Sequence, residues 1–241
     1  IRTQPVSSIM QSAFPFADIS TGIDALASML TADNPAVGGP ATKYLVFLDE
    51  PKANNGTISA TNGGGVYFRT ITLTQGAGGV VSTSGASTAS LEGATIVGGS
   101  VSTSAAGPLN CTGGTSVLDS VTLNPGSLCQ VLDNTILTIA PAGIVNNGTI
   151  AVQTVGGAGN LTRIRAVGAA TISGTGTVRL QAIGLSNNSA YLDGQGNAAT
   201  PLTLGSGQTL TGSGRLFGFI TIGGTISPDQ PFGTPGPISR F

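Results

Sequence analysis

A six-residue stretch of this chain recurs after twenty positions. Residues 80–85 read Val-Val-Ser-Thr-Ser-Gly, and residues 100–105 read Ser-Val-Ser-Thr-Ser-Ala. The same offset maps Thr95–Val97 onto Thr115–Val117. A fixed period near twenty residues, made of short β-branched runs between Gly-rich corners, is typical of a β-solenoid turn. Such a turn cannot bury its apolar side chains alone, so it stacks on the next one.

Stacking places like residues about 4.8 Å apart in neighbouring turns. We therefore expect an all-β parallel coil in which Val81 lies beside Val101. The segment Ser82–Ser84 should lie beneath Ser102–Ser104 and form ladders of hydroxyl groups on a solvated face.

The composition excludes several classes of protein. Of the 241 residues only 8% are charged, the net charge is −1 and there is no His. With so little charge and a mean hydropathy of +0.29, the chain does not have the composition of a disordered protein. Its nine Lys and Arg are scattered, which argues against nucleic acid and anionic membrane surfaces as partners. No apolar run approaches the roughly 18 residues that span a bilayer, so we expect no membrane insertion.

Composition also divides the chain into three expected parts. Residues 1–54 are predicted to form an N-terminal cap, residues 55–230 the coil, and residues 231–241 a Pro- and Gly-rich tail. In the cap we expect a helix over Thr21–Ala32. The continuous apolar run in Lys43–Leu48 predicts a strand that is buried on both faces.

The predicted helix carries Ile23, Leu26 and Leu30 on one face. This face either covers the open end of the coil or docks to a neighbouring subunit. Together with Phe232 and Phe241 of the tail, these residues are the candidate assembly contacts. Head-to-tail contacts between the two terminal regions would build a filament, and deleting residues 231–241 should then lower the assembled mass.

Short runs rich in Val, Ile and Thr between Asn, Gly and Pro are the candidate strands. They are Tyr67–Thr74, Val80–Thr83, Ala94–Val97, Val117–Leu123, Thr135–Ile139, Thr149–Val152, Ala170–Ser173, Thr177–Leu180, Leu202–Leu204, Gln208–Thr211 and Arg215–Ile222.

One region resembles a known family. Residues 134–150 read Asn-Thr-Ile-Leu-Thr-Ile-Ala-Pro-Ala-Gly-Ile-Val-Asn-Asn-Gly-Thr-Ile, which is similar to the passenger repeats of autotransporters and of filamentous-haemagglutinin-type adhesins. Residues 223–228, Gly-Gly-Thr-Ile-Ser-Pro, resemble a phrase common near the end of such passengers, with Asp229 where Gly is usual. The likeness covers roughly residues 55–230. It implies a right-handed parallel β-helix at a cell surface.

Cys111 and Cys129 lie eighteen positions apart, close to one turn of the coil. The spacing places them on adjacent turns, within reach of a disulfide, and the alternative is two free thiols buried as small apolar groups.

Carboxylates are the candidate catalytic groups, because two of them about 5–10 Å apart are the minimal equipment of a glycosidase. Asp119 and Asp133 both follow Val-Leu and could stack, and Asp193 and Asp229 are further candidates. Each acid could equally accept turn N–H bonds at a corner. Since there is no cluster of acids and no Trp, we expect no catalytic residues and no enzyme activity. We also expect no metal site and no cofactor.

These features favour an extracellular or cell-surface protein that is structural or adhesive, forms filaments or other homo-oligomers, and associates through its terminal regions. The alternative is a virion tailspike or fibre that binds a host glycan. A polysaccharide-cleaving enzyme comes third.

Overall fold

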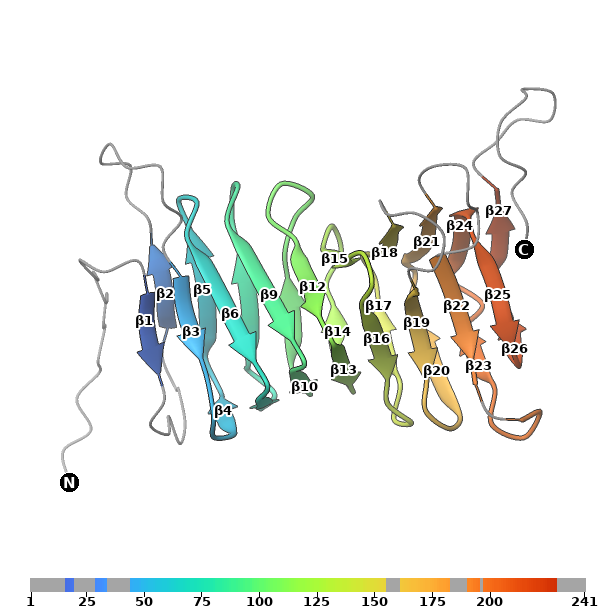
Figure 1. The fold of residues 1–241 in the computed structure, drawn as a ribbon, viewed down its shortest axis with the longest axis horizontal. Helices are drawn as coiled ribbons and strands as arrows, with labels where there is room; N and C mark the ends of the chain where they lie inside the picture. The colour runs from blue at the N-terminus through green and yellow to red at the C-terminus, as the bar shows by residue number, and fades with distance from the viewer. Residues whose placement is uncertain are drawn as a thin grey trace.

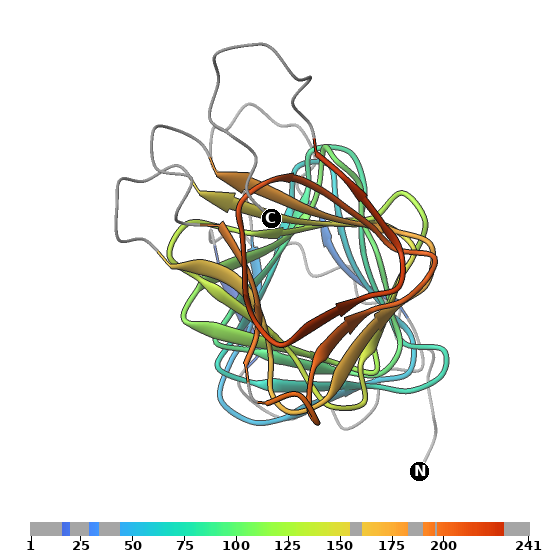
Figure 2. The same cartoon turned by 90° about the vertical axis from the view of Figure 1, so that its right-hand side faces the viewer.

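The computed structural model describes residues 16–19, 29–33, 44–154, 161–182, 190–195 and 197–228. Within these ranges the chain is entirely β, and its 27 strands lie side by side along the long axis of the molecule (Figure 1). Viewed along that axis, the strands enclose the core from three sides (Figure 2). Three sheets form these sides, and we call them sheets A, B and C.

Each sheet collects every third strand of the coil. Sheet A contains, in spatial order, β1 (Phe16–Ile19), β3 (Tyr44–Phe47), β6 (Gly65–Arg69), β9 (Thr88–Glu92), β12 (Leu109–Gly113), β15 (Leu128–Val131), β18 (Thr149–Thr154), β21 (Thr177–Ala182), β24 (Thr209–Ser213) and β27 (Thr225–Ser227). Sheet B contains β4 (Lys52–Asn54), β7 (Thr72–Gln75), β10 (Thr95–Val97), β13 (Thr115–Asp119), β16 (Ile136–Ile139), β19 (Thr162–Ala166), β22 (Ala190–Gly194) and β25 (Arg215–Gly218). Sheet C contains β2 (Met29–Asp33), β5 (Thr57–Thr61), β8 (Val80–Thr83), β11 (Ser100–Ser102), β14 (Thr122–Leu123), β17 (Ile144–Asn146), β20 (Ala170–Ser173), β23 (Leu202–Leu204) and β26 (Ile220–Ile222).

From β3 onward the chain visits sheets A, B and C in turn and then returns to A. Every strand pair among the described residues is parallel. The predicted all-β parallel coil is therefore confirmed. Its right-handed sense stays a prediction.

The twenty-residue register holds for one stretch of the coil and then shifts. Val81 pairs with Val101, and Ser82 with Ser102, as predicted. Thr95, however, pairs with Val117 and not with Thr115. The shift begins at a β-bulge between Cys111 and Gly113 in β12, where one extra residue enters the strand.

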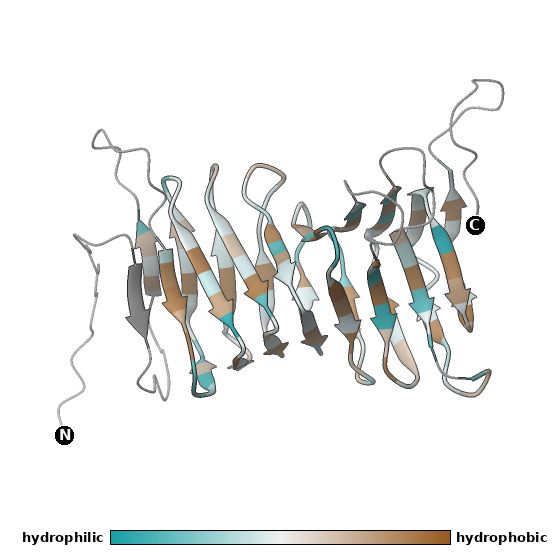
Figure 3. Ribbon diagram, viewed as in Figure 1, coloured by the Kyte–Doolittle hydropathy of each residue, from teal (hydrophilic) through white to brown (hydrophobic). Residues whose placement is uncertain are grey.

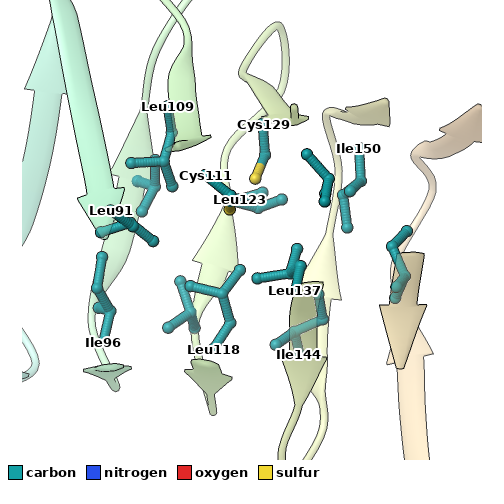
Figure 4. Packing of buried hydrophobic residues seen from close by; sticks show 14 of the residues in the cluster. Leu91, Ile96, Leu109, Cys111, Leu118, Leu123, Cys129, Leu137, Ile144 and Ile150 are labelled. Carbon is teal, nitrogen blue, oxygen red and sulfur yellow. The ribbon is translucent and has the colours of Figure 1, made fainter. Parts of the chain in front are cut away.

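Columns of apolar side chains fill the interior, one residue per turn (Figure 4). Phe47 and Phe68 are neighbours in one column, with their rings stacked and their centroids 5.0 Å apart. The column continues through Leu91, Cys111, Val131, Val152 and Leu180. An interior turn packs its apolar side chains against the turn on either side, so its stability depends on both neighbours.

Three predicted strands are each two strands in the structure. Tyr67–Thr74 is divided by Thr70, Val117–Leu123 by Ser120, and Arg215–Ile222 by the corner at Gly218. The φ angles of these dividing residues are 50°, 57° and 75°. A single left-handed residue turns the chain from one sheet to the next, so no loop is needed. Thr and Ser are not the usual residues for that conformation, which is why sequence patterns missed the corners.

The N-terminal prediction needs one correction. Residues 29–32 of the predicted helix belong to strand β2, which pairs with β5, and residues 21–28 lie outside the described ranges. The strand predicted over Lys43–Leu48 is found as β3, but only Leu45 and Phe47 of that strand are buried, so the predicted burial on both faces is wrong. Strands before residue 55 share the three sheets with strands after it, so the expected boundary at residue 54 does not mark the start of the coil.

Two buried amide pairs secure corners of the coil. Asn146 donates to Gln208 Oε1 at 2.9 Å, and Gln208 Nε2 donates to the carbonyl oxygens of Asn146 and Ser173, each at 2.8 Å. Asn54 donates to Gln75 Oε1 at 3.1 Å in the same way near the other end. These bonds satisfy polar groups that the turns carry into the interior.

Candidate functional site

The last described strands of sheet B carry a group of charged and aromatic side chains. In β19, Thr162, Ile164 and Ala166 are buried, so the alternating residues Arg163 and Arg165 face outward. Hydrophilic segments appear on β19 and β22, and β25 begins hydrophilic and continues hydrophobic (Figure 3).

Register brings these side chains into two columns. Arg163 pairs with Tyr191, and Tyr191 with Arg215. In the next column, Arg165 pairs with Asp193, and Asp193 with Phe217. The two columns together make a surface of three guanidinium groups, one carboxylate and two aromatic rings.

Asp193 lies between two arginines. Its Oδ2 atom accepts hydrogen bonds from Arg163 Nη1 at 3.0 Å and from Arg165 Nε at 3.3 Å, and its side chain is only 1% exposed. Asp193 Oδ1 and Arg163 Nε are buried and have no hydrogen-bond partner in the structure. An unpartnered buried polar group costs about 1–3 kcal/mol. These two atoms therefore keep unused hydrogen-bonding capacity at the edge of the cleft.

A cavity of about 200 Å³ opens beside this carboxylate. Its lining consists of Leu161, Arg163, Tyr191, Asp193 and Phe217. Phe217 is 62% exposed, although aromatic rings are usually buried. The cavity is smaller than the roughly 300–1,000 Å³ of drug-sized ligand sites, and it suits a single ring.

The structure separates Asp119 from Asp133, the two carboxylates predicted to stack. Asp119 ends β13 in sheet B, whereas Asp133 follows β15 in sheet A, so the predicted stacking of these two residues is wrong. The two Val-Leu-Asp segments do not pair with each other, because the turns differ in length. Leu118 of the first segment pairs with Ile139, and Val131 of the second pairs with Cys111. Asp229 lies outside the described residues.

A second cavity, of about 280 Å³, lies on sheet A near the other end of the coil and is lined by Tyr44, Val46, Tyr67, Ser90 and Thr112. The Tyr67 hydroxyl donates to Glu92, and Arg69 Nε lies 3.5 Å from the same carboxylate. Burial, followed by the hydrogen bond to Glu92, raises the pKa of Tyr67 above its usual value. Since the phenolate is the nucleophilic form, this environment disfavours Tyr67 as a nucleophile.

The two cysteines meet inside the coil. Cys129 pairs with Leu109 and Cys111 with Val131, so the thiols lie diagonally on neighbouring strands (Figure 4). Both are buried free thiols in the structure. The hydrogen bond with Cys129, together with burial, raises the pKa of the Cys111 thiol well above its usual range. The neighbouring-turn placement matches the expectation, and the disulfide stays a prediction.

Leu30 is the one predicted assembly residue whose side chain is described. It is 3% exposed and lies in the protein's own core, on a strand and not on a helix face. Ile23, Leu26, Phe232 and Phe241 fall outside the described residues.

The hydroxyl ladder is found only in part. Thr83 and Thr103 are buried and donate to backbone carbonyl oxygens, so these two do not lie on a solvated face as predicted. The column that contains Ser82 extends further than the repeat predicted. Ser82 pairs with Ser59 as well as with Ser102, and Ser59 pairs with Thr31. After Ser102 the column ends, because Val101 pairs with Leu123 and the next outward residue is Asn124.

Sequence reasoning missed the Arg–Asp–aromatic cleft. The sequence does contain one indication of this cleft. Arg163 and Arg165 alternate with Ile164, so in a strand they must lie on the same face. Their partner Asp193 comes from a turn of 28 residues, far from the twenty-residue repeat, so spacing could not place it.

The described residues contain no group of three or more His, Cys, Asp or Glu that could hold a metal ion. They also contain no helix long and apolar enough to cross a membrane. No protein-family model, no curated protein and no solved structure matches this chain.

Proposed function

We propose that this protein is an extracellular or cell-surface rod with a structural or adhesive role, and that it self-associates through its C-terminal end. The observation that carries the proposal is the exposed apolar surface of the last described strands, β25 to β27. Leu216, Ile220, Ile222 and Ile226 stack on the buried Leu192, Leu202, Leu204 and Leu210 of the turn before.

In any earlier turn such side chains are covered by the next one. Here Ile226 is 46% exposed, and Leu216, Ile220 and Ile222 are only partly buried. Strands β25, β26 and β27 also end their sheets, so each presents a free edge among the described residues. Free edges beside an apolar surface pair with other chains unless they are covered. A net charge of −1 adds little repulsion between copies.

The other end of the coil differs chemically. On β4, the first described strand of sheet B, Lys52 is 2% exposed, and its ammonium group donates to the carbonyl oxygens of Leu48 and Glu50 at 3.2 and 2.7 Å. An inward-pointing charge on an edge strand opposes pairing with another chain. The C-terminal end is therefore the better assembly surface.

The proposal includes no catalysis. Asp193 is the only described carboxylate in its cleft and is engaged by two arginines. A virion tailspike or fibre remains the second candidate, and the cleft on sheet B is what favours it.

The substitution Ile226→Lys tests the proposal, because it places a charge on the open end without disturbing a buried position. We expect the intact chain to form species larger than a monomer in light scattering and Ile226→Lys to reduce them. The matched control is Val145→Lys, since Val145 is 39% exposed on β17 in the middle of the coil and should leave the assembled mass unchanged. A monodisperse monomer at high concentration, or equal effects of the two variants, would refute self-association through this end.

A further inference from the structure

We infer that the cleft on β19, β22 and β25 binds a saccharide unit that carries a carboxylate. This inference goes beyond the structural role and does not depend on self-association. It concerns a lateral face of sheet B, whereas the proposed assembly surface is the end of the coil.

The first step is charge. Arg163 and Arg165 lie on β19 and Arg215 on β25, with β22 between these strands, and Asp193 is the only acid on the three strands. The face therefore has an excess of two positive charges in a protein whose net charge is −1. This excess favours an anionic ligand. A planar guanidinium group matches a carboxylate with two parallel hydrogen bonds.

The second step is the unused hydrogen-bonding capacity. Arg163 contributes Nη1 to Asp193 but keeps Nε without a partner, and Asp193 keeps Oδ1 without a partner. A ligand that satisfies both atoms must offer an acceptor and a donor close together. A carboxylate beside a hydroxyl group provides that combination, and an anion without a proton to donate, such as sulfate, does not.

The third step is the pair of aromatic rings. Tyr191 and Phe217 lie on neighbouring strands in adjacent columns and both line the cavity. The electron-rich face of an aromatic ring attracts the C–H groups on the face of a pyranose. A cavity of about 200 Å³ accommodates one such ring. A ligand with a carboxylate, a neighbouring hydroxyl group and an apolar ring face is a uronic acid or a sialic acid unit.

Titration of the labelled protein with tetragalacturonate, followed by amide NMR shifts, tests the inference. We expect saturable shifts on β19, β22 and β25, and at least about tenfold weaker binding for the fully methyl-esterified oligomer, since loss of a charged hydrogen bond costs at least that factor. Phe217→Ala and Arg163→Gln should each weaken binding of the acid about tenfold or more. Phe217 is exposed, so its variant should fold even if Arg163→Gln does not.

The control variant is Arg69→Gln, the same change at an exposed arginine on sheet A, which should leave affinity within about twofold. Three results would overturn the inference. They are no saturable shifts up to about 10 mM oligomer, equal binding of the acid and its ester, and equal binding of potassium acetate, which would mark a general anion site.

Discussion

At the scale of single residues, Gly212 shows how tightly adjacent turns approach. Its φ is +95°, and a Cβ built there would lie 1.9 Å from the carbonyl oxygen of Leu180. Gly126 has φ +79°, but a Cβ at that position meets nothing within 4 Å. The first glycine is needed for both conformation and space, and the second only for conformation.

We therefore expect Gly126→Ala to cost about 1–2 kcal/mol, the usual penalty of a left-handed backbone, and Gly212→Ala to cost at least about 2 kcal/mol more. Urea unfolding of the two variants measures the difference. Equal losses would mean that β24 does not lie against β21 as the structure has it.

The cysteine pair makes stability depend on pH. Because the pKa of Cys111 is raised in the folded state, the unfolded thiol ionises first, at about its ordinary pKa of 9.0. The stabilisation is therefore fully present below pH 9 and is lost as pH rises through the folded pKa. Under reducing conditions we expect the free energy of unfolding to fall between pH 9 and pH 10, and Cys111→Val to make that fall shallower. An unchanged slope in the variant would contradict the assigned environment.

At the scale of elements, strands and corners should differ in their tolerance of inserted residues. One Ala inserted between Cys129 and Gln130 reverses the facing of one part of β15, because successive side chains of a strand alternate between its two faces. We expect a loss of about 3 kcal/mol or more through exposed core residues. One Gly inserted after Gly126, at an open corner, should cost less than about 1 kcal/mol, since loop length has a weak effect. Thermal or urea unfolding compares the two variants, and similar losses would argue against β15 as a core strand.

The contrast between strands and corners also explains which strand boundaries the sequence could predict. Three strands were predicted with the bounds that they have in the structure, namely β8 (Val80–Thr83), β20 (Ala170–Ser173) and β23 (Leu202–Leu204). Each is flanked by Gly or Pro, or its residues alternate between apolar and polar. Corners made by one left-handed Thr or Ser carry no such signal, so strands on either side were merged.

Register was predictable only locally. The repeat gave the pairing of Val81 with Val101, but the bulge in β12 changes the offset for every later residue of that turn. Contacts across longer turns, such as Arg165 with Asp193, depend on the length of each corner, which no local pattern encodes.

At the scale of the whole molecule, the coil separates two kinds of surface. The last described strands, β25 to β27, present apolar side chains beside edges that no other described strand pairs with, whereas the side of sheet B presents the cleft of arginines and aromatic rings. Ile226→Lys should alter assembly and leave saccharide binding intact, and Phe217→Ala should weaken binding through the cleft. Each proposal can therefore fail without the other.

The central claim is that three sheets are wound from one parallel coil, in which residues one turn apart touch. Methyl NOEs in a sample labelled at Val and Leu test it most directly. The account predicts cross-peaks from Val101 to Val81 and to Leu123, its neighbours in the turns on either side, and none between Val81 and Leu123, which are two strand spacings or roughly 10 Å apart. Cross-peaks that join Val101 to Val121 and not to Leu123, or that require antiparallel pairing of these strands, would contradict it.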